Sequence, residues 1–165
     1  MDEAIQIGRW LVRPDVLRTR EAHSKLSRGG AAECSCTGCQ NFEAVRPQLL
    51  AGPLGRILGQ LGISPPWEVE VYEAGRTPPG LYRYGGWFHF VGTIESGGDA
   101  WRRVGKGSAV CKVADFEPLS ETLSIGFHTD VALVRKPFAG LPLVQLEITA
   151  EPPWVISAAE PDRAG

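Results

Sequence analysis

From residue 67 onward, the chain consists of short segments in which apolar and polar residues alternate, separated by turns rich in glycine and proline. The clearest alternation covers residues 123–128 and 144–149, and residues 67–72 and 81–94 are also strand-like. A period of two is typical of strands that bury one face. Parallel strands would need crossover connections of about a dozen or more residues, so the short turns favour antiparallel pairing. The sequence therefore predicts an α+β fold built on a mostly antiparallel, twisted β-sheet or sandwich.

One or two short helices are expected in the first half of the chain. Residues 42–49 carry apolar side chains at helical spacing, and Pro47 should limit this piece. Residues 50–61 carry a second apolar stripe. Pro53 suits the first turn of this helix, and Gly62 suits the residue after its end.

The N-terminal segment is predicted to begin with a strand over residues 4–13, which Pro14 ends. The charged stretch at residues 15–33 is interpreted as a solvated loop, with a basic binding arm as the alternative. Because the chain shows no internal repeat and no domain boundary, we expect residues 1–157 to form a single α+β domain. Residues 158–165 are expected to form a flexible tail.

Composition restricts the class of protein. The 165-residue chain is 43% apolar and has a formal net charge of −2, which fits one globular domain and offers no basic surface for nucleic acid. The acidic N-terminus lacks the apolar run of a signal peptide, and no run of about 18 apolar residues indicates a membrane span. We therefore expect a cytoplasmic protein whose partner is another protein or a small molecule, and neither a nucleic acid nor a membrane.

Three of the four cysteines, Cys34, Cys36 and Cys39, lie close together in the sequence. Thiolates bind zinc tetrahedrally and usually in fours, and Gly38 permits the tight backbone of a metal-binding loop. We therefore predict a structural zinc site. The fourth ligand would have to come from elsewhere in the chain, and Cys111 is the first choice by residue type. The other candidates are His23, His89 and His128.

Three other states of the cysteines stay open. The thiols could remain reduced and unligated at the start of a helix, or they could form a disulfide, although cytoplasmic thiols are kept reduced. Cys39 could also be a reactive thiol, because a helix beginning near Gln40 would lower its pKa. The sequence shows neither the strand that precedes a thioredoxin-type pair nor the cysteine spacing of an iron–sulfur cluster.

The remaining polar and aromatic residues are given structural interpretations. Asn41 is expected to cap the helix that follows it, His89 to be a core residue, and His128 to lie on the polar face of its strand with Asp130 nearby. The aromatic residues of the sheet are expected to fill the core, with a ligand groove as the alternative; they include Tyr82, Tyr84, Trp87 and Trp101. Three acidic residues are expected to be exposed and solubilising: Glu68, Glu70 and Glu147.

The motif Cys34-x-Cys36-x-x-Cys39-x-Asn41-Phe42 is followed by Leu61-Gly62-Ile63, by the aromatic segment 84–92, and by Gln145-Leu146-Glu147 and Pro153-Trp154-Val155. Together these segments resemble a family of small uncharacterised bacterial proteins, over roughly residues 5–156. The resemblance implies a bacterial, cytoplasmic, single-domain protein, and it implies no activity.

The sequence thus favours a non-enzymatic binding or interaction domain with a cysteine-rich corner that zinc stabilises. The alternative is a small enzyme that uses a reactive Cys39 or an open metal site near His128 or His89. A small partner protein of the antitoxin or immunity type is a third hypothesis, based on size and mild acidity.

Overall fold

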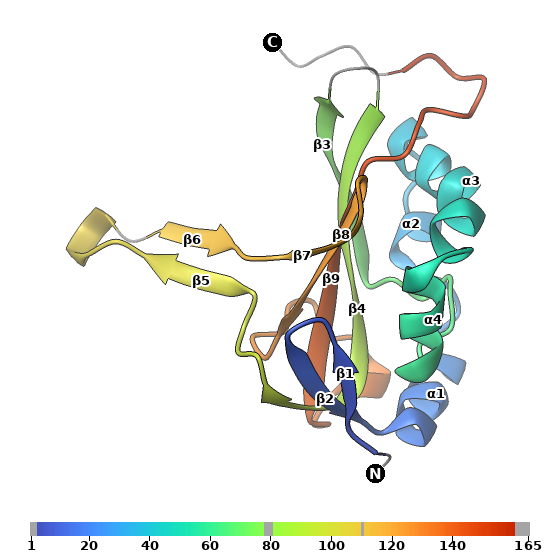
Figure 1. The fold of residues 1–165 in the computed structure, drawn as a ribbon. Helices are drawn as coiled ribbons and strands as arrows, with labels where there is room; N and C mark the ends of the chain where they lie inside the picture. Colours follow the sequence, from blue (N-terminus) through green and yellow to red (C-terminus); the bar gives the residue numbers. More distant parts are fainter. Residues whose placement is uncertain (1–2, 78–80, 110, 161–165) are drawn as a thin grey trace.

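In the computed structural model, a layer of helices covers one face of a seven-stranded sheet, and a two-stranded hairpin projects from the other side (Figure 1). The structure describes residues 3–77, 81–109 and 111–160. The predicted α+β class and the mostly antiparallel sheet are confirmed. Among the described residues, no helix has the length and apolar character needed to cross a membrane.

The large sheet has the strand order β1-β2-β4-β9-β8-β7, and β3 also pairs with β4. All these pairings are antiparallel. The strands are β1 (Ile5–Ile7), β2 (Trp10–Pro14), β3 (Glu70–Thr77), β4 (Leu81–Ser96), β7 (Glu117–Ser120), β8 (Leu123–His128) and β9 (Leu143–Ala150).

The aromatic segment that could have been a hairpin is one strand, β4, which is 16 residues long. Strand β3 pairs with residues 81–87 of β4 and β2 with residues 92–96. The two short strands therefore lie end to end along one side of β4, while β9 occupies its other side. The glycines at 85 and 86 do not break the strand, and Gly85 lies under the Tyr72 ring, where a Cβ atom would come within 2.2 Å of that ring.

The helices are α1 (Val16–Ser24), α2 (Gly30–Glu33), α3 (Thr37–Leu50) and α4 (Pro53–Gln60). The last of these matches its prediction, because Pro53 begins it and Gly62 follows it with a φ of +75°. In contrast, α3 continues through Pro47 to Leu50. Proline removes one backbone donor, and the packing of this helix against the sheet outweighs that loss.

The expectation of a solvated loop over residues 15–33 is wrong, because α1 and α2 lie there. The Asp15 side chain caps α1 by accepting a hydrogen bond from the Arg18 amide at 3.0 Å. Thr19, which is fully buried, then fixes the helix to the sheet: its Oγ1 accepts from the Val91 amide at 2.9 Å. Few apolar residues of α1 are buried against the sheet, so the sequence of this helix has only a weak apolar pattern.

The main core lies between the sheet and helices α3 and α4. Alternate residues of β4 and β9, such as Phe88 and Ile148, meet Phe42 of α3 and Leu54 of α4 there. Burial of each such side chain contributes about 1.5–3 kcal/mol. This core places the start of α3, which carries the cysteines, next to β3.

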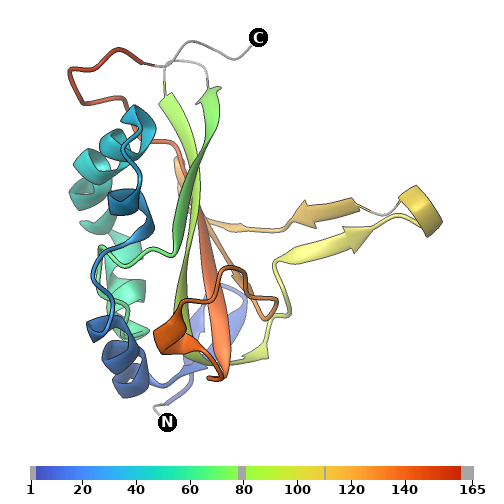
Figure 2. The same cartoon turned by 180° about the vertical axis from the view of Figure 1, so that it is seen from behind.

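Strands β5 (Trp101–Val104) and β6 (Cys111–Ala114) form the separate hairpin, with the 3-10 helix η1 (Gly107–Ala109) between them. The hairpin leaves the sheet on the side opposite the helices, as the view from behind also shows (Figure 2). A second 3-10 helix, η2 (Lys136–Phe138), lies in the connection between β8 and β9.

Part of the predicted C-terminal tail is in contact with the domain. The Trp154 indole donates to the backbone oxygen of Ala158 at 2.7 Å, and Glu160 forms an ion pair with Arg76. The chain therefore stays on the domain to residue 160, and residues 161–165 lie outside the described part.

Candidate functional site

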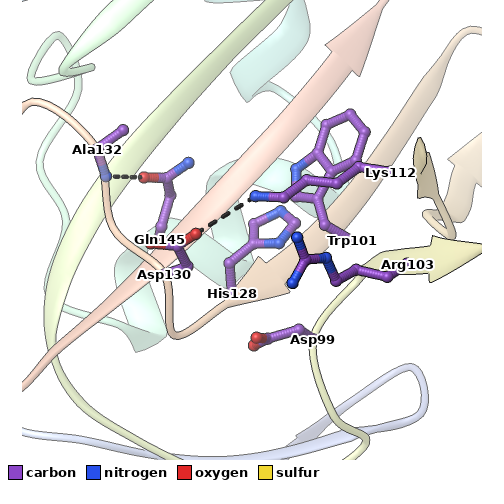
Figure 3. A pocket seen from close by; sticks show the side chains of 8 residues that line it. All are labelled: Asp99, Trp101, Arg103, Lys112, His128, Asp130, Ala132 and Gln145. Atoms are coloured by element: carbon purple, nitrogen blue, oxygen red, sulfur yellow. Dashed lines mark hydrogen bonds and ion pairs between the residues drawn. The ribbon is translucent and has the colours of Figure 1, made fainter. Parts of the chain in front are cut away.

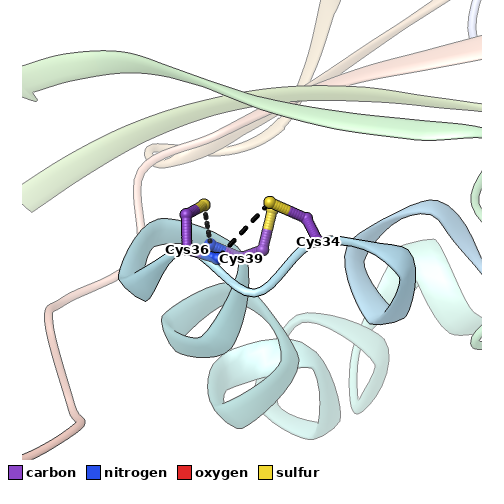
Figure 4. Close-up of side chains that lie close together, drawn as sticks. All are labelled: Cys34, Cys36 and Cys39. Carbon is purple, nitrogen blue, oxygen red and sulfur yellow. Dashed lines mark hydrogen bonds between the residues drawn. The ribbon is translucent and has the colours of Figure 1, made fainter.

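The three clustered cysteines meet at the junction of α2 and α3 (Figure 4). Their sulfur atoms all lie within 4.8 Å of one another. Cys34 ends α2, Cys36 is the N-cap of α3, and Cys39 lies in the first turn of α3. The spacing C-x-C-x-x-C therefore brings all three side chains to one helix start, close enough to bind a metal ion.

Backbone amides face two of these sulfur atoms. The Cys36 amide donates to Sγ of Cys34 at 3.5 Å, and the Cys39 amide donates to Sγ of Cys36 at 3.4 Å. Amides directed at sulfur stabilise the thiolate form, which is the form that binds metals. Hydrogen bonds from the amide of Cys36 and from the neighbouring cysteines lower the pKa of Cys34, which is exposed.

Cys39 has the opposite environment. It is buried, with 7% of its surface exposed, and burial, together with the two neighbouring thiols, raises its pKa far above the ordinary value. A thiol in this state is a poor nucleophile at neutral pH. The burial of Cys39 therefore does not favour the hypothesis of a reactive thiol at this position.

The structure does not bring the fourth cysteine to this cluster. Cys111 begins β6 in the projecting hairpin, where it is exposed and its thiol donates to the backbone oxygen of Val104 at 3.6 Å. That hairpin and α3 lie on opposite sides of the sheet (Figure 1). All four cysteines are free thiols.

The nearest strand brings a carboxylate to the cysteine loop instead. A Cβ atom at Gly38 would lie 2.5 Å from an oxygen of Glu73, a residue of β3. The Glu73 side chain thus occupies the space that the glycine leaves open. From the neighbouring strand β4, the Tyr84 hydroxyl donates to the backbone oxygen of Gly38 at 2.9 Å. Sequence reasoning missed Glu73, because only the pairing of β3 with β4 places it beside residue 38.

Asn41 is not a helix cap. It lies inside α3, is fully buried, and connects the helix to the C-terminal segment. Its Oδ1 accepts from the Val155 amide at 2.7 Å, and its Nδ2 donates to the Tyr84 hydroxyl and to the Pro153 backbone oxygen, both at 3.2 Å. Its position in the cysteine motif thus has a structural reason.

The three histidines take part in a chain of buried polar side chains, and none of them lies in the cysteine cluster. Nε2 of His23 lies 3.1 Å from the backbone oxygen of His89, and Nε2 of His89 lies 3.3 Å from Oε1 of Gln145. Because both partner atoms are acceptors, each ring carries its proton on Nε2. Burial lowers the pKa of His23 and lowers that of His89 to about 4.

The polar chain continues to Glu147 at the base of the hairpin. Oε2 of Glu147 accepts from the Trp101 indole at 2.9 Å and from Nε2 of Gln145 at 3.5 Å, and it lies 3.2 Å from Nε2 of His128. Burial raises the pKa of Glu147, but the hydrogen bonds from His128 and Trp101 outweigh it, so the pKa lies below its ordinary value.

Three residues that the alternating pattern assigned to a polar face are in fact buried. Glu147 is 5% exposed, His128 is 1% exposed, and Glu68 is 1% exposed and forms an ion pair with Arg46 of α3. Among the described residues, the cysteine cluster is the one group of three or more metal-binding side chains. An open metal site at His89 or His128 therefore has no ligand set in this part of the chain.

The fold and the cysteine cluster define an α+β protein with a three-thiol site at the start of a helix. Comparisons with protein-family models, with curated proteins and with solved structures find no match. The resemblance to a bacterial family therefore stays a prediction.

Proposed function

We propose that the protein is a non-enzymatic binding domain in which Cys34, Cys36 and Cys39 hold one zinc ion that stabilises the α2–α3 corner. The observation that carries this proposal is the convergence of three sulfur atoms within 4.8 Å. Zn–S bonds of about 2.3 Å at tetrahedral angles separate thiolate sulfurs by about 3.8 Å. Small side-chain adjustments therefore suffice to bring the three sulfurs onto one ion.

The surroundings of the cysteines support a metal ion over unligated thiols. The amides that donate to Cys34 and Cys36 fix the loop in the shape in which the sulfurs converge, and such secondary contacts orient metal ligands. Gly38 leaves room for the Glu73 carboxylate beside the loop, and a larger residue there would displace that side chain. Cys34 and Cys36 are exposed, so their thiols add no buried packing to this corner.

We propose Glu73 as the fourth ligand. Carboxylate oxygen is an accepted zinc ligand, and the Glu73 side chain lies against the residue next to Cys39 in the sequence. Three thiolates on one Zn²⁺ give a net charge of −1, so a fourth anionic ligand is tolerated only where the loop supplies compensating amides. Coordination by Glu73 would tie the start of α3 to β3 and close the site.

The first experiment measures bound metal. Untagged protein, purified without chelator, should contain about one zinc per chain, and replacement by Co²⁺ should give thiolate-to-metal charge-transfer absorption. Cys36→Ser should abolish both signals. Cys111→Ser is the matched control, and it should keep full zinc content because Cys111 lies in the hairpin. Zinc-free wild-type protein, in material never exposed to chelator, would contradict the proposal.

The second experiment tests the structural role and the fourth ligand. A strong chelator should lower the melting temperature of the wild type and leave that of Cys36→Ser unchanged, because metal binding and folding are coupled. Glu73→Gln should keep the Co²⁺–thiolate bands, shift the d–d bands, and weaken zinc binding by at least about tenfold. Unchanged d–d bands would show that Glu73 is not a ligand while leaving the three-cysteine site intact.

A further inference from the structure

A pocket of about 560 Å³ lies at the base of the projecting hairpin (Figure 3), and this hairpin leaves the sheet on the side opposite the helices (Figure 1). The hairpin forms one wall with Trp101, Arg103 and Lys112, and the sheet forms the floor with His128 and Gln145. This volume is in the range of small-molecule sites in proteins. The walls come from segments far apart in the sequence, so no local sequence motif indicates the pocket.

The hairpin directs two positive charges into this pocket from directly opposite positions. Arg103 of β5 and Lys112 of β6 are Cα partners in the antiparallel register, and both line the pocket. Directly opposite residues of an antiparallel pair lie on the same face, and like charges there are destabilising. An anion held between the two side chains would remove this repulsion.

Two carboxylates, Asp99 and Asp130, also line the pocket and balance its formal charge, but among the described residues neither forms an ion pair with Arg103. Both oxygens of Asp99 accept hydrogen bonds from Thr129. Asp130 forms a 3.4 Å ion pair with Lys112, but the Asp130 side chain is 84% exposed, so the pair is weak. Within the described ranges, Arg103 has no ion-pair partner, whereas its neighbour Arg102 pairs with Asp115 at 3.1 Å.

The floor of the pocket carries a buried group without a partner. His128 is 1% exposed; among the described residues its Nδ1 has no hydrogen-bond partner, and its Nε2 has only the 3.2 Å contact with Glu147. The ring stacks on Trp101, with 5.9 Å between ring centroids and an interplanar angle of 27°. Its Nε2 faces Glu147, which leaves Nδ1 for another molecule. Unpaired buried polar atoms are costly and are usually satisfied by a partner.

We propose that this pocket binds a small organic anion, whose carboxylate or phosphate group lies between Arg103 and Lys112 and whose polar body reaches His128. The hairpin supplies the charges, and the sheet supplies the aromatic and hydrogen-bonding floor. This site is independent of the zinc proposal, because the two sites lie on opposite sides of the sheet and share no residue.

The test uses ¹⁵N-labelled full-length protein titrated separately with inorganic phosphate and with succinate at constant ionic strength. At least one probe should shift the Trp101 indole N–H resonance saturably, since this group lies at the pocket and donates to Glu147. Saturation by phosphate alone would indicate a phosphate ester as the ligand class, and saturation by succinate would indicate a carboxylate. No shift with either probe at millimolar concentration would overturn the proposal.

Arg103→Gln should weaken binding of the active probe by about tenfold or more, because it removes a charge-assisted contact. Arg102→Gln is the matched control: it removes the same charge from the adjacent residue, which points to the other face of the strand, and it should leave binding nearly unchanged. If Arg103→Gln disturbs the hairpin, Lys112→Gln serves as the second variant. Equal loss in the Arg103 and Arg102 variants would reduce the effect to general surface charge and overturn the site.

Discussion

At the scale of single residues, Asn41 connects three separate parts of the fold. Three hydrogen bonds from one buried amide join α3, β4 and residues 153–155. The side chain itself is completely enclosed. The residue therefore makes the attachment of the C-terminal segment depend on the helix that carries the cysteines.

We predict that Asn41→Ala lowers the free energy of unfolding by about 2–4 kcal/mol, since it removes three hydrogen bonds, one of them to the buried Tyr84 hydroxyl. Urea denaturation measures the loss. Gln40→Ala changes the neighbouring, exposed amide and should cost no more than about 0.5 kcal/mol. Similar losses for the two variants would show that the buried bonds do not stabilise the fold.

The buried residues also show what alternation can and cannot predict. The pattern in β8 and β9 correctly places Phe127 and Leu146 on one face and His128 and Glu147 on the other. Alternation says which side of a sheet a residue faces, but not whether another segment covers that side. Here the hairpin base covers it, and Trp101 contacts both His128 and Glu147. These contacts depend on long-range topology, which local sequence does not encode.

At the scale of elements, α1 is the clearest case of a helix with a weak sequence pattern. Its buried residues are Thr19, Ala22 and His23, two of which are polar. The helix is held by its cap and by hydrogen bonds to the sheet more than by an apolar stripe. In contrast, α4 has a strong apolar stripe with a proline at its start, and its prediction is confirmed.

Removal of the cap should destabilise α1 measurably. We predict that Asp15→Ala costs about 1 kcal/mol, which lowers the melting temperature of a domain of this size by about 2–4 °C. Asp15→Ser keeps an oxygen acceptor for the Arg18 amide and should restore most of this stability. Equal melting temperatures for the Ala and Ser variants would show that the cap contributes nothing.

The cysteine cluster was predictable as an element and not as a complete site. The local spacing of Cys34, Cys36 and Cys39 brings the three sulfurs together because they surround one helix start. The position of Cys111 depends on where the hairpin leaves the sheet, and Glu73 depends on strand pairing. The positions of both residues depend on the assembled fold. Residue type alone therefore predicted Cys111 as the fourth ligand, and the structure places Cys111 away from the cluster.

At the scale of the whole molecule, the buried histidines make stability depend on pH. The pKa of His89 is lowered to about 4 by burial, and that of His23 is also lowered. The unfolded chain, with histidine pKa values near 6.5, therefore takes up protons first as the pH falls. The stabilisation is complete above about pH 6.5 and is lost toward pH 4.

We predict that the free energy of unfolding falls between about pH 7 and pH 4 by an amount on the order of 3 kcal/mol for His89 alone. Burial raises the pKa of Glu68. Glu68 therefore takes up a proton more readily in the folded state, which adds stability as the pH falls and partly offsets the loss due to the histidines. Urea denaturation across this range measures the slope. His89→Gln keeps an amide that can reach Gln145 and cannot titrate, so its slope should be smaller. A slope identical to that of the wild type would assign the pH dependence to other groups.

The hairpin that forms one wall of the pocket also makes the chain easy to extend. Residues 105–108 are exposed at the far end of β5 and β6, away from the sheet and from the cluster of Cys34, Cys36 and Cys39. Exposed loop tips of this kind accept insertions without loss of the core. A short epitope or a fluorescent label inserted between Gly105 and Ser108 would therefore be exposed at the end of the hairpin, away from the main sheet.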